Sequence, residues 1–136
     1  MKNKGQSSLE TLLILMVGIT LLIPITNYIR LYQISYRDTY KLSMAKDSTQ
    51  DLAEAADSIF LQGHPAGITV TINIPEGVKE GIISERTIQF KVKTSSGIND
   101  VFSFTNEDIQ GTLPISPGHH KILVKNEGDI VSINEV

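Results

Sequence analysis

A short polar string at the N-terminus contains the residues best placed for chemistry. It runs from Lys4 to Glu10 with the sequence KGQSSLE and lies directly before a long charge-free stretch. One interpretation is a helix N-terminus, because Ser7 and Glu10 have the S-x-x-E spacing of a capping box, which satisfies two otherwise unbonded backbone N–H groups. An acidic side chain in the first helical turn also interacts favourably with the positive end of the helix dipole.

The rest of the sequence gives little support for catalysis or metal binding. His119 and His120 are adjacent, so on a strand their side chains point to opposite faces and cannot easily share a metal ion. The sequence contains no GxSxG, phosphate-loop or HExxH motif. Because the chain has no cysteine, a disulfide scaffold, a cysteine-ligated zinc site and a thiol nucleophile are excluded. We therefore expect no enzymatic activity, no catalytic residue, no metal site and no cofactor.

Length and charge indicate one small domain with an appendage. The chain has 136 residues, with 12 Lys and Arg against 15 Asp and Glu, and the net charge of −3 gives no support for nucleic-acid binding. The charge divides unevenly: +2 over residues 1–5, −2 over residues 6–62 and −3 over residues 63–136. This division predicts a basic leader, a long helix-like segment and an acidic remainder.

The appendage is an apolar stretch of membrane-spanning length. Residues 11–29 carry no charge and would form a helix of about 28 Å, close to the roughly 30 Å of a bilayer core. Lys2 and Lys4 precede it, so the positive-inside rule predicts a cytoplasmic N-terminus. Removal by an ordinary signal peptidase would need small residues just after the stretch, but the first alanine is Ala45. A single-pass anchor and an exported polymer subunit both remain possible on these grounds.

The N-terminal string also resembles a known processing signal. It is similar to the class III signal peptide of archaeal type IV pilin-like proteins, in which a short basic leader ending in glycine precedes a Q-x-S-x-E core. Here Lys4 and Gly5 end the leader, and Gln6, Ser8 and Glu10 form the core, directly before the apolar stretch. The resemblance implies that a prepilin peptidase cuts between Gly5 and Gln6 and leaves the apolar segment on the mature protein.

Cleavage at that bond would give Glu10 a specific role. The new α-amino group on Gln6 lies four residues before Glu10, on the same face of a helix. A carboxylate in apolar surroundings costs a few kcal/mol on insertion scales, so pairing with an amine offsets that cost. The amine can belong to the same subunit or to a neighbour, and the resemblance implies that such a contact sets the register of packed subunits.

Two residues interrupt the apolar helix. Pro24 removes one helical hydrogen bond, and Gly18 costs up to about 1 kcal/mol relative to alanine. They are either a kink that a membrane helix tolerates or a point of flexibility where the helix stretches after packing. The sequence does not separate these interpretations.

All four tyrosines are spaced by four residues and form one ladder along the predicted helix. An aromatic ladder on a filament subunit invites a charge-transport interpretation, but aromatic packing between helices requires fewer assumptions. The members are Tyr28, Tyr32, Tyr36 and Tyr40.

The helical pattern continues beyond the membrane as an amphipathic segment. Apolar and small residues recur at intervals of three and four, which predicts one buried face, and Gly63-His64-Pro65 predicts the helix end. We therefore expect one long helix over residues 6–62. The predicted buried face consists of Leu42, Ala45, Thr49, Leu52, Ala56 and Ile59.

Residues 63–136 have the period-two pattern of β-strands. About 74 residues make a marginal core alone, so we expect five or six short, mostly antiparallel strands packed against the apolar helix face. This predicts an α+β fold with the lollipop architecture of pilins. The expected strands cover residues 68–74, 88–92, 101–105, 121–125 and 130–133.

The sequence therefore predicts a structural subunit of an archaeal type IV-like pilus, a surface filament for adhesion. Expected partners are copies of itself or related pilins, a prepilin peptidase and a membrane assembly platform. The precursor is expected in the cell membrane and the mature protein in an extracellular filament. A minor pilin and an archaellum-like filament protein are alternatives in the same class. An uncleaved, membrane-anchored extracytoplasmic binding or adhesion module is the alternative from another class.

Overall fold

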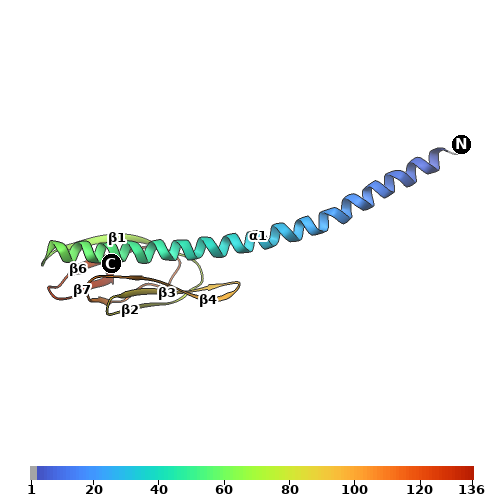
Figure 1. The fold of residues 1–136 in the computed structure, drawn as a ribbon. Coiled ribbons are helices and arrows are strands. Elements are labelled where there is room, and N and C mark those ends of the chain that lie inside the picture. Colours follow the sequence, from blue (N-terminus) through green and yellow to red (C-terminus); the bar gives the residue numbers. More distant parts are fainter. Residues whose placement is uncertain (1–2) are drawn as a thin grey trace. The chain divides into compact units, whose positions relative to one another are not determined.

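The computed structural model describes residues 3–136, with side chains from Gly5 onward. The chain forms two compact units, Met1–Arg37 and Asp38–Val136, which are described separately below. Helix α1, Asn3–Gln62, contributes to both (Figure 1). Figure 1 also shows the strands gathered around the second part of this helix.

The first unit is helical throughout its described residues. Hydroxyl groups within its apolar stretch donate to the backbone of the preceding turn: Thr20 Oγ1 bonds to Met16 O at 2.8 Å and Thr26 Oγ1 to Ile23 O at 2.9 Å. These bonds satisfy the polar side chains within the helix itself, as an apolar environment requires.

The second unit contains seven strands within the described residues. They form a four-stranded sheet of order β1-β6-β7-β5 and a three-stranded sheet of order β2-β3-β4. The strands are β1 Gly67–Ile74, β2 Val78–Ser84, β3 Thr87–Thr94, β4 Gly97–Phe104, β5 Ile109–Gly111, β6 Gly118–Asn126 and β7 Val131–Glu135. This arrangement confirms the expected α+β class, in which a long N-terminal helix packs on a small β-rich domain.

Most strand pairs are antiparallel, and three of them, β2·β3, β3·β4 and β6·β7, join consecutive strands through short turns. The pairs β1·β6, β2·β3, β3·β4 and β6·β7 are all antiparallel. The exception is β5, which pairs with β7 in parallel, with Ile109 opposite Val131. Strands β2 and β5 were not predicted, because β2 is polar and interrupted by Gly81 and β5 has only three residues.

The predicted helix face is buried against both sheets. Ala45, Thr49, Leu52 and Ala56 have no exposed surface, and Ile59 has 2%. Leu42, the first residue of the predicted face, is only partly buried against the same core. Ser48 and Ala53 are buried as well, so the buried face is wider than the predicted stripe. Fully burying each large apolar side chain contributes about 1.5–3 kcal/mol. The strands contribute Ile72, Ile74, Ile88, Phe90, Val92, Ile122, Val124, Val131 and Ile133 to this core.

The buried face of α1 is wide because side chains on both of its sides bond to edge strands of the two sheets. On one side, Ser48 Oγ donates to Asn73 O of β1 at 2.8 Å. On the other side, Lys46 Nζ donates to Phe102 O of β4 at 2.6 Å, and Thr49 Oγ1 lies 3.0 Å from Ser103 Oγ. Since β1 and β4 are edge strands, these side chains of α1 bond to an edge of each sheet.

The C-terminal end of α1 is fixed by a glycine and by a buried amide. Gly63 has φ +79°, the left-handed conformation common after a helix, and its N–H donates to Phe60 O at 3.1 Å. Asn126, at the end of β6, is 1% exposed and its Nδ2 lies 3.3 Å from Ile59 O and 3.4 Å from Phe60 O. The last carbonyls of the helix are therefore bonded by a residue far away in the sequence.

Candidate functional site: the apolar half of α1

The predicted processing string lies entirely within α1. Gln6, Ser8 and Glu10 are exposed, and Gly5 has open space around its Cα. The side chain of Lys4 and the residues Met1 and Lys2 lie outside the described part of the structure. Gln6 and Glu10 are one helical turn apart, so a new amine on Gln6 would lie on the same face as the carboxylate.

The helix start bears on the capping interpretation. Because α1 begins at Asn3, Ser7 lies inside the helix and not at its N-cap. Its carbonyl accepts a hydrogen bond from Thr11 Oγ1 at 2.9 Å. The serine–glutamate pair therefore does not form a capping box at the start of α1.

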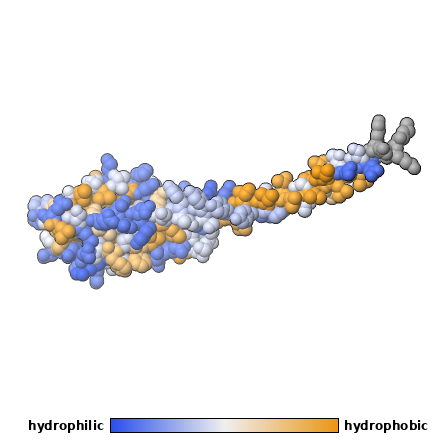
Figure 2. All heavy atoms as spheres, turned by 45° about the horizontal axis from the view of Figure 1, so that its top comes forward, coloured by the Kyte–Doolittle hydropathy of each residue, from blue (hydrophilic) through white to orange (hydrophobic). Residues whose placement is uncertain are grey.

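The apolar stretch that follows has exposed side chains along its length. Figure 2 shows apolar side chains gathered along the N-terminal part of α1. The segment is long and apolar enough to cross a membrane, and none of its most apolar window is buried. This supports association with a membrane. The exposed side chains include Leu9, Leu12, Leu13, Ile14, Leu15, Met16, Val17, Ile19, Leu21, Leu22, Ile23 and Ile25.

The two helix-interrupting residues lie within this stretch, and α1 continues through both. Pro24 is inside the helix, and a Cβ added at Gly18 would meet no atom within 4 Å. Since Pro24 has no N–H, it makes no bond to the carbonyl four residues earlier. Both positions are therefore open to a neighbouring helix.

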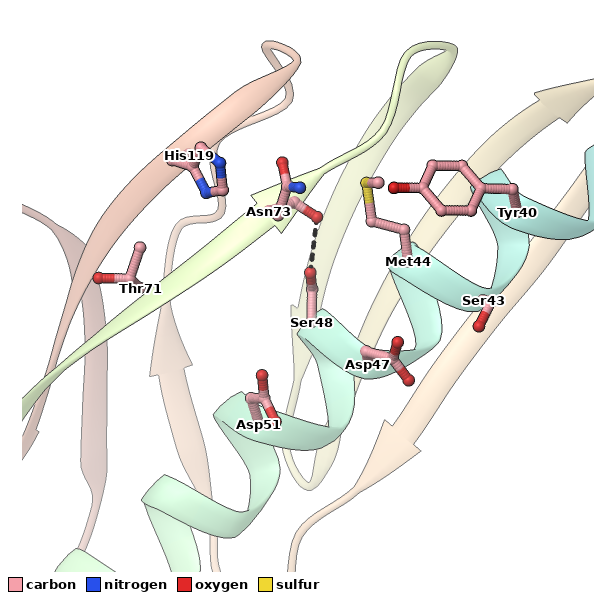
Figure 3. A pocket seen from close by; sticks show the side chains of 9 residues that line it. All are labelled: Tyr40, Ser43, Met44, Asp47, Ser48, Asp51, Thr71, Asn73 and His119. Atoms are coloured by element: carbon pink, nitrogen blue, oxygen red, sulfur yellow. Dashed lines mark hydrogen bonds between the residues drawn. The ribbon is translucent and has the colours of Figure 1, made fainter. Parts of the chain in front are cut away.

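The tyrosine ladder is exposed along its whole length. Tyr28 is 71% exposed, and the exposure of the others lies between 56% and 65%. Tyr40 also lies at the end of a groove of about 460 Å³ in the second unit, between α1 and the strands β1 and β6 (Figure 3). The groove is lined by Tyr40, Ser43, Met44, Asp47, Ser48, Asp51, Thr71, Asn73 and His119.

The polar side chains that line this groove come from α1, β1 and β6. The Ser48 hydroxyl is already used in its bond to Asn73 O (Figure 3). Asp47 and Asp51 project from α1 and His119 from β6. Among the described residues, no group of three His, Asp or Glu side chains could hold a metal ion.

The two adjacent histidines occupy different surroundings, as strand alternation predicts. His119 lines the groove, whereas His120 Nδ1 lies 2.6 Å from Glu135 Oε1 and its Nε2 lies 2.9 Å from Ser116 O. His120 therefore holds β6 to the end of β7 and to the preceding loop.

A carboxylate ties the β3–β4 turn to α1. Asp38 Oδ2 accepts hydrogen bonds from the Ser95 hydroxyl and from the Ser95 N–H, the latter at 3.0 Å. These bonds favour the charged carboxylate and lower the pKa of Asp38, with a smaller contribution from the nearby positive charge of Lys41. Asp38 is the first residue of the second unit, so the turn is anchored at that unit's boundary.

Strand β4 has a feature that the sequence pattern conceals. Ser103 and the residue directly after the strand, Thr105, are buried, at 7% and 6% exposure, whereas Phe102 and Phe104 are 45% and 69% exposed. The polar residues face inward because Ser103 Oγ bonds to α1, where it accepts from Lys46 Nζ at 3.2 Å. Alternation alone indicated the two faces but not which of them was buried.

Comparison with known proteins gives no relative. No protein-family model, no curated protein and no solved structure matches this chain. Functional conclusions therefore depend on the residues and the geometry described above.

Proposed function

We propose that this protein is a structural subunit of an archaeal type IV-like pilus. A prepilin peptidase cuts the precursor between Gly5 and Gln6, and the apolar half of α1 then assembles into a surface filament for adhesion. The observation that carries this proposal is the exposed, charge-free segment of α1 directly after the basic–glycine–QxSxE string.

The exposed segment explains why a membrane and a filament would be alternative environments. Burying one large apolar side chain contributes about 1.5–3 kcal/mol, so a helix with many exposed Leu and Ile residues is unstable in water. A bilayer covers these side chains before assembly. Neighbouring copies cover the same side chains afterwards, which makes the transfer from membrane to filament feasible.

The pairing of Glu10 with the Gln6 amine explains why cleavage precedes the transfer from membrane to filament. Before cleavage Gln6 is part of a peptide bond and has no free amine, so Glu10 has no positive partner within its own turn. Cleavage creates that partner and removes the positive charges of the leader. Only the processed chain then has the contact that sets the register between copies.

Cleavage followed by assembly requires several partner proteins. They are identical or related pilins, the prepilin peptidase and a membrane assembly platform. The second unit, Asp38–Val136, forms the outer surface of the filament in this proposal. Its acidic residues outnumber its basic ones, which suits contact with water.

Filament shearing tests the proposal. The wild-type chain and the Glu10→Ala variant are expressed in an archaeal cell with a working pilus apparatus, and sheared filaments are separated from membranes. We expect wild-type protein in both fractions, and Glu10→Ala in the membrane fraction but strongly depleted from filaments. Wild-type protein confined to membranes would favour an anchored extracytoplasmic module. Wild-type protein at trace level in filaments of another pilin would indicate a minor pilin.

A further inference from the structure

A short segment of α1 is apolar but lies beyond the membrane-spanning stretch. We call residues 30–37 the collar. Its large apolar side chains are well exposed: Leu31 by 68%, Tyr32 and Tyr36 by 65% each, and Ile34 by 47%. The collar follows the charge-free residues whose length matches a bilayer core, and it precedes the first residue of the second unit. It therefore needs a partner other than lipid chains.

The second unit has an apolar surface that also lacks a partner. Beside strand β4, two hollows of about 420 and 370 Å³ share Lys46 and Phe102 in their linings and form what we call the β4 groove, between α1 and β4. Phe102 and Phe104 form its aromatic wall, with ring centroids 5.2 Å apart at 65°, and Ile98 on the same strand is 64% exposed. Exposed aromatic pairs of this kind are typical of protein contact surfaces.

The collar and the β4 groove have opposite charges. The collar carries Arg30 and Arg37 and no acidic residue. The groove is lined by Glu54, Asp57 and Asp100, and its one lysine already donates to the backbone and a hydroxyl of β4. Arginine pairs with carboxylates and also stacks on aromatic rings, so both features of the groove favour it.

The collar is also short enough to fit along the β4 groove. Eight helical residues extend about 12 Å, and a strand from Ile98 to Phe104 extends about 20 Å. The groove is thus long enough to hold the whole collar with its two arginines.

We propose that the collar of one copy docks in the β4 groove of a second copy. Phe102 and Phe104 pack against Tyr32 and Tyr36, and Arg37 pairs with the acidic side of the groove. Because the two surfaces differ, the contact is heterologous and can continue from copy to copy without closing. This inference rests on the proposed function, since it describes one contact within the assembled filament.

Engineered disulfides test the contact, because the natural chain has no cysteine. One full-length chain carrying Tyr36→Cys and another carrying Phe104→Cys are coexpressed in cells that assemble filaments. The sheared filaments are then oxidised. A disulfide forms only where Cα atoms approach within about 4.4–6.8 Å. We expect a cross-linked pair on a non-reducing gel, at least fivefold more abundant than with Tyr36→Cys and Leu123→Cys. Leu123 is a matched control because it is an exposed apolar residue of the other sheet, at 40%.

Charge reversal gives a second and independent test. Glu54 is a suitable residue for the reversal because it accepts a hydrogen bond from Gln50 at the exposed surface of α1. Arg37→Glu should reduce the filament yield at least tenfold, and adding Glu54→Lys in the same chain should restore most of it. Circular dichroism of the purified chains shows whether each variant is folded.

The outcomes separate this inference from the proposed function. Filaments that form normally but cross-link equally at both cysteine pairs would overturn the collar contact and leave the pilus assignment intact. Failure of Glu54→Lys to restore assembly of a folded Arg37→Glu chain would also overturn it. Absence of any filament or oligomer of the wild-type chain would contradict both proposals.

Discussion

The anchoring of the α1 C-terminus by Asn126 gives a quantitative prediction. The Asn126 side chain is buried and makes three hydrogen bonds: two from Nδ2 to the carbonyls of Ile59 and Phe60, and one that Oδ1 accepts from the Gly128 N–H at 2.7 Å. In Asn126→Ala, Phe60 O keeps its bond from the Gly63 N–H, but the other two backbone groups lose these partners.

The size of the effect follows from those two groups. Leaving a buried backbone group unsatisfied costs about 1–3 kcal/mol. Ile59 O is buried, whereas Gly128 is exposed, so water partly compensates for the bond lost at the Gly128 N–H. We therefore expect Asn126→Ala to lower the free energy of unfolding of the second unit by about 2–4 kcal/mol. For a unit of about 100 residues this corresponds to a fall in Tm of roughly 10–20 °C.

Thermal unfolding of the full chain in detergent, followed by circular dichroism, measures this change. Asn134→Ala is the matched control, because Asn134 is exposed on β7. It should change stability by less than about 0.5 kcal/mol. A loss below 0.5 kcal/mol in Asn126→Ala, or an equal loss in both variants, would refute the anchoring argument.

Three further predictions concern the second unit. Gly111 has φ +144° and a Cβ added there would lie 1.8 Å from Ile133 O, so Gly111→Ala should cost more than about 2 kcal/mol in urea unfolding and separate β5 from β7. Because hydrogen bonding lowers the pKa of Asp38 below its ordinary value of 3.8, the bonds to Ser95 should persist above that pH and be lost as the pH falls through the lower folded pKa. The protection of the Ser95 amide, measured as its exchange rate relative to the intrinsic rate at the same pH, should therefore fall on acidification. Ser103→Ala should cost about 1–2 kcal/mol, since it removes a buried hydroxyl that bonds to α1.

Each of these has a control in the same chain. Gly97 has φ +131° but open space around it, so Gly97→Ala should cost less than the clash at Gly111. Asp38→Asn should make the protection of the Ser95 amide, relative to its intrinsic exchange rate, nearly independent of pH, and a pH profile of protection unchanged from the wild type would contradict the carboxylate's role. Phe104→Ala should cost less than Ser103→Ala despite removing a larger side chain, because Phe104 is exposed. The reverse order would show that the burial of β4 is assigned incorrectly.

The sequence predicted those parts of the fold in which local pattern and packing agree. The apolar positions of α1 from Ala45 to Ile59 repeat at helical spacing and are buried, and strands such as β1 and β3 alternate regularly. It did not predict β5, whose three residues acquire their structure only from pairing with β7. The inward Ser103 and outward Phe102 could not be assigned either, because the face of β4 that is buried depends on where α1 docks.

The candidate processing and assembly site could be found from the sequence without knowledge of the fold. The string from Lys4 to Glu10 and the apolar stretch are continuous in sequence, so no folding information was needed to find them. The β4 groove combines residues of α1 with residues about 50 positions later, and the sequence alone gave no sign that they meet. The capping interpretation of Ser7 failed because a helix can begin before an apparent capping residue when the preceding residues also adopt helical geometry.

Processing of the N-terminus tests the central claim most directly. The chain is coexpressed with an archaeal prepilin peptidase, and its intact mass and N-terminal sequence are determined beside a control pilin. The account predicts loss of residues 1–5, so that Gln6 is the new N-terminus with the apolar half of α1 retained. An intact leader under conditions in which the control pilin is cut would contradict the account and favour an uncleaved membrane-anchored module.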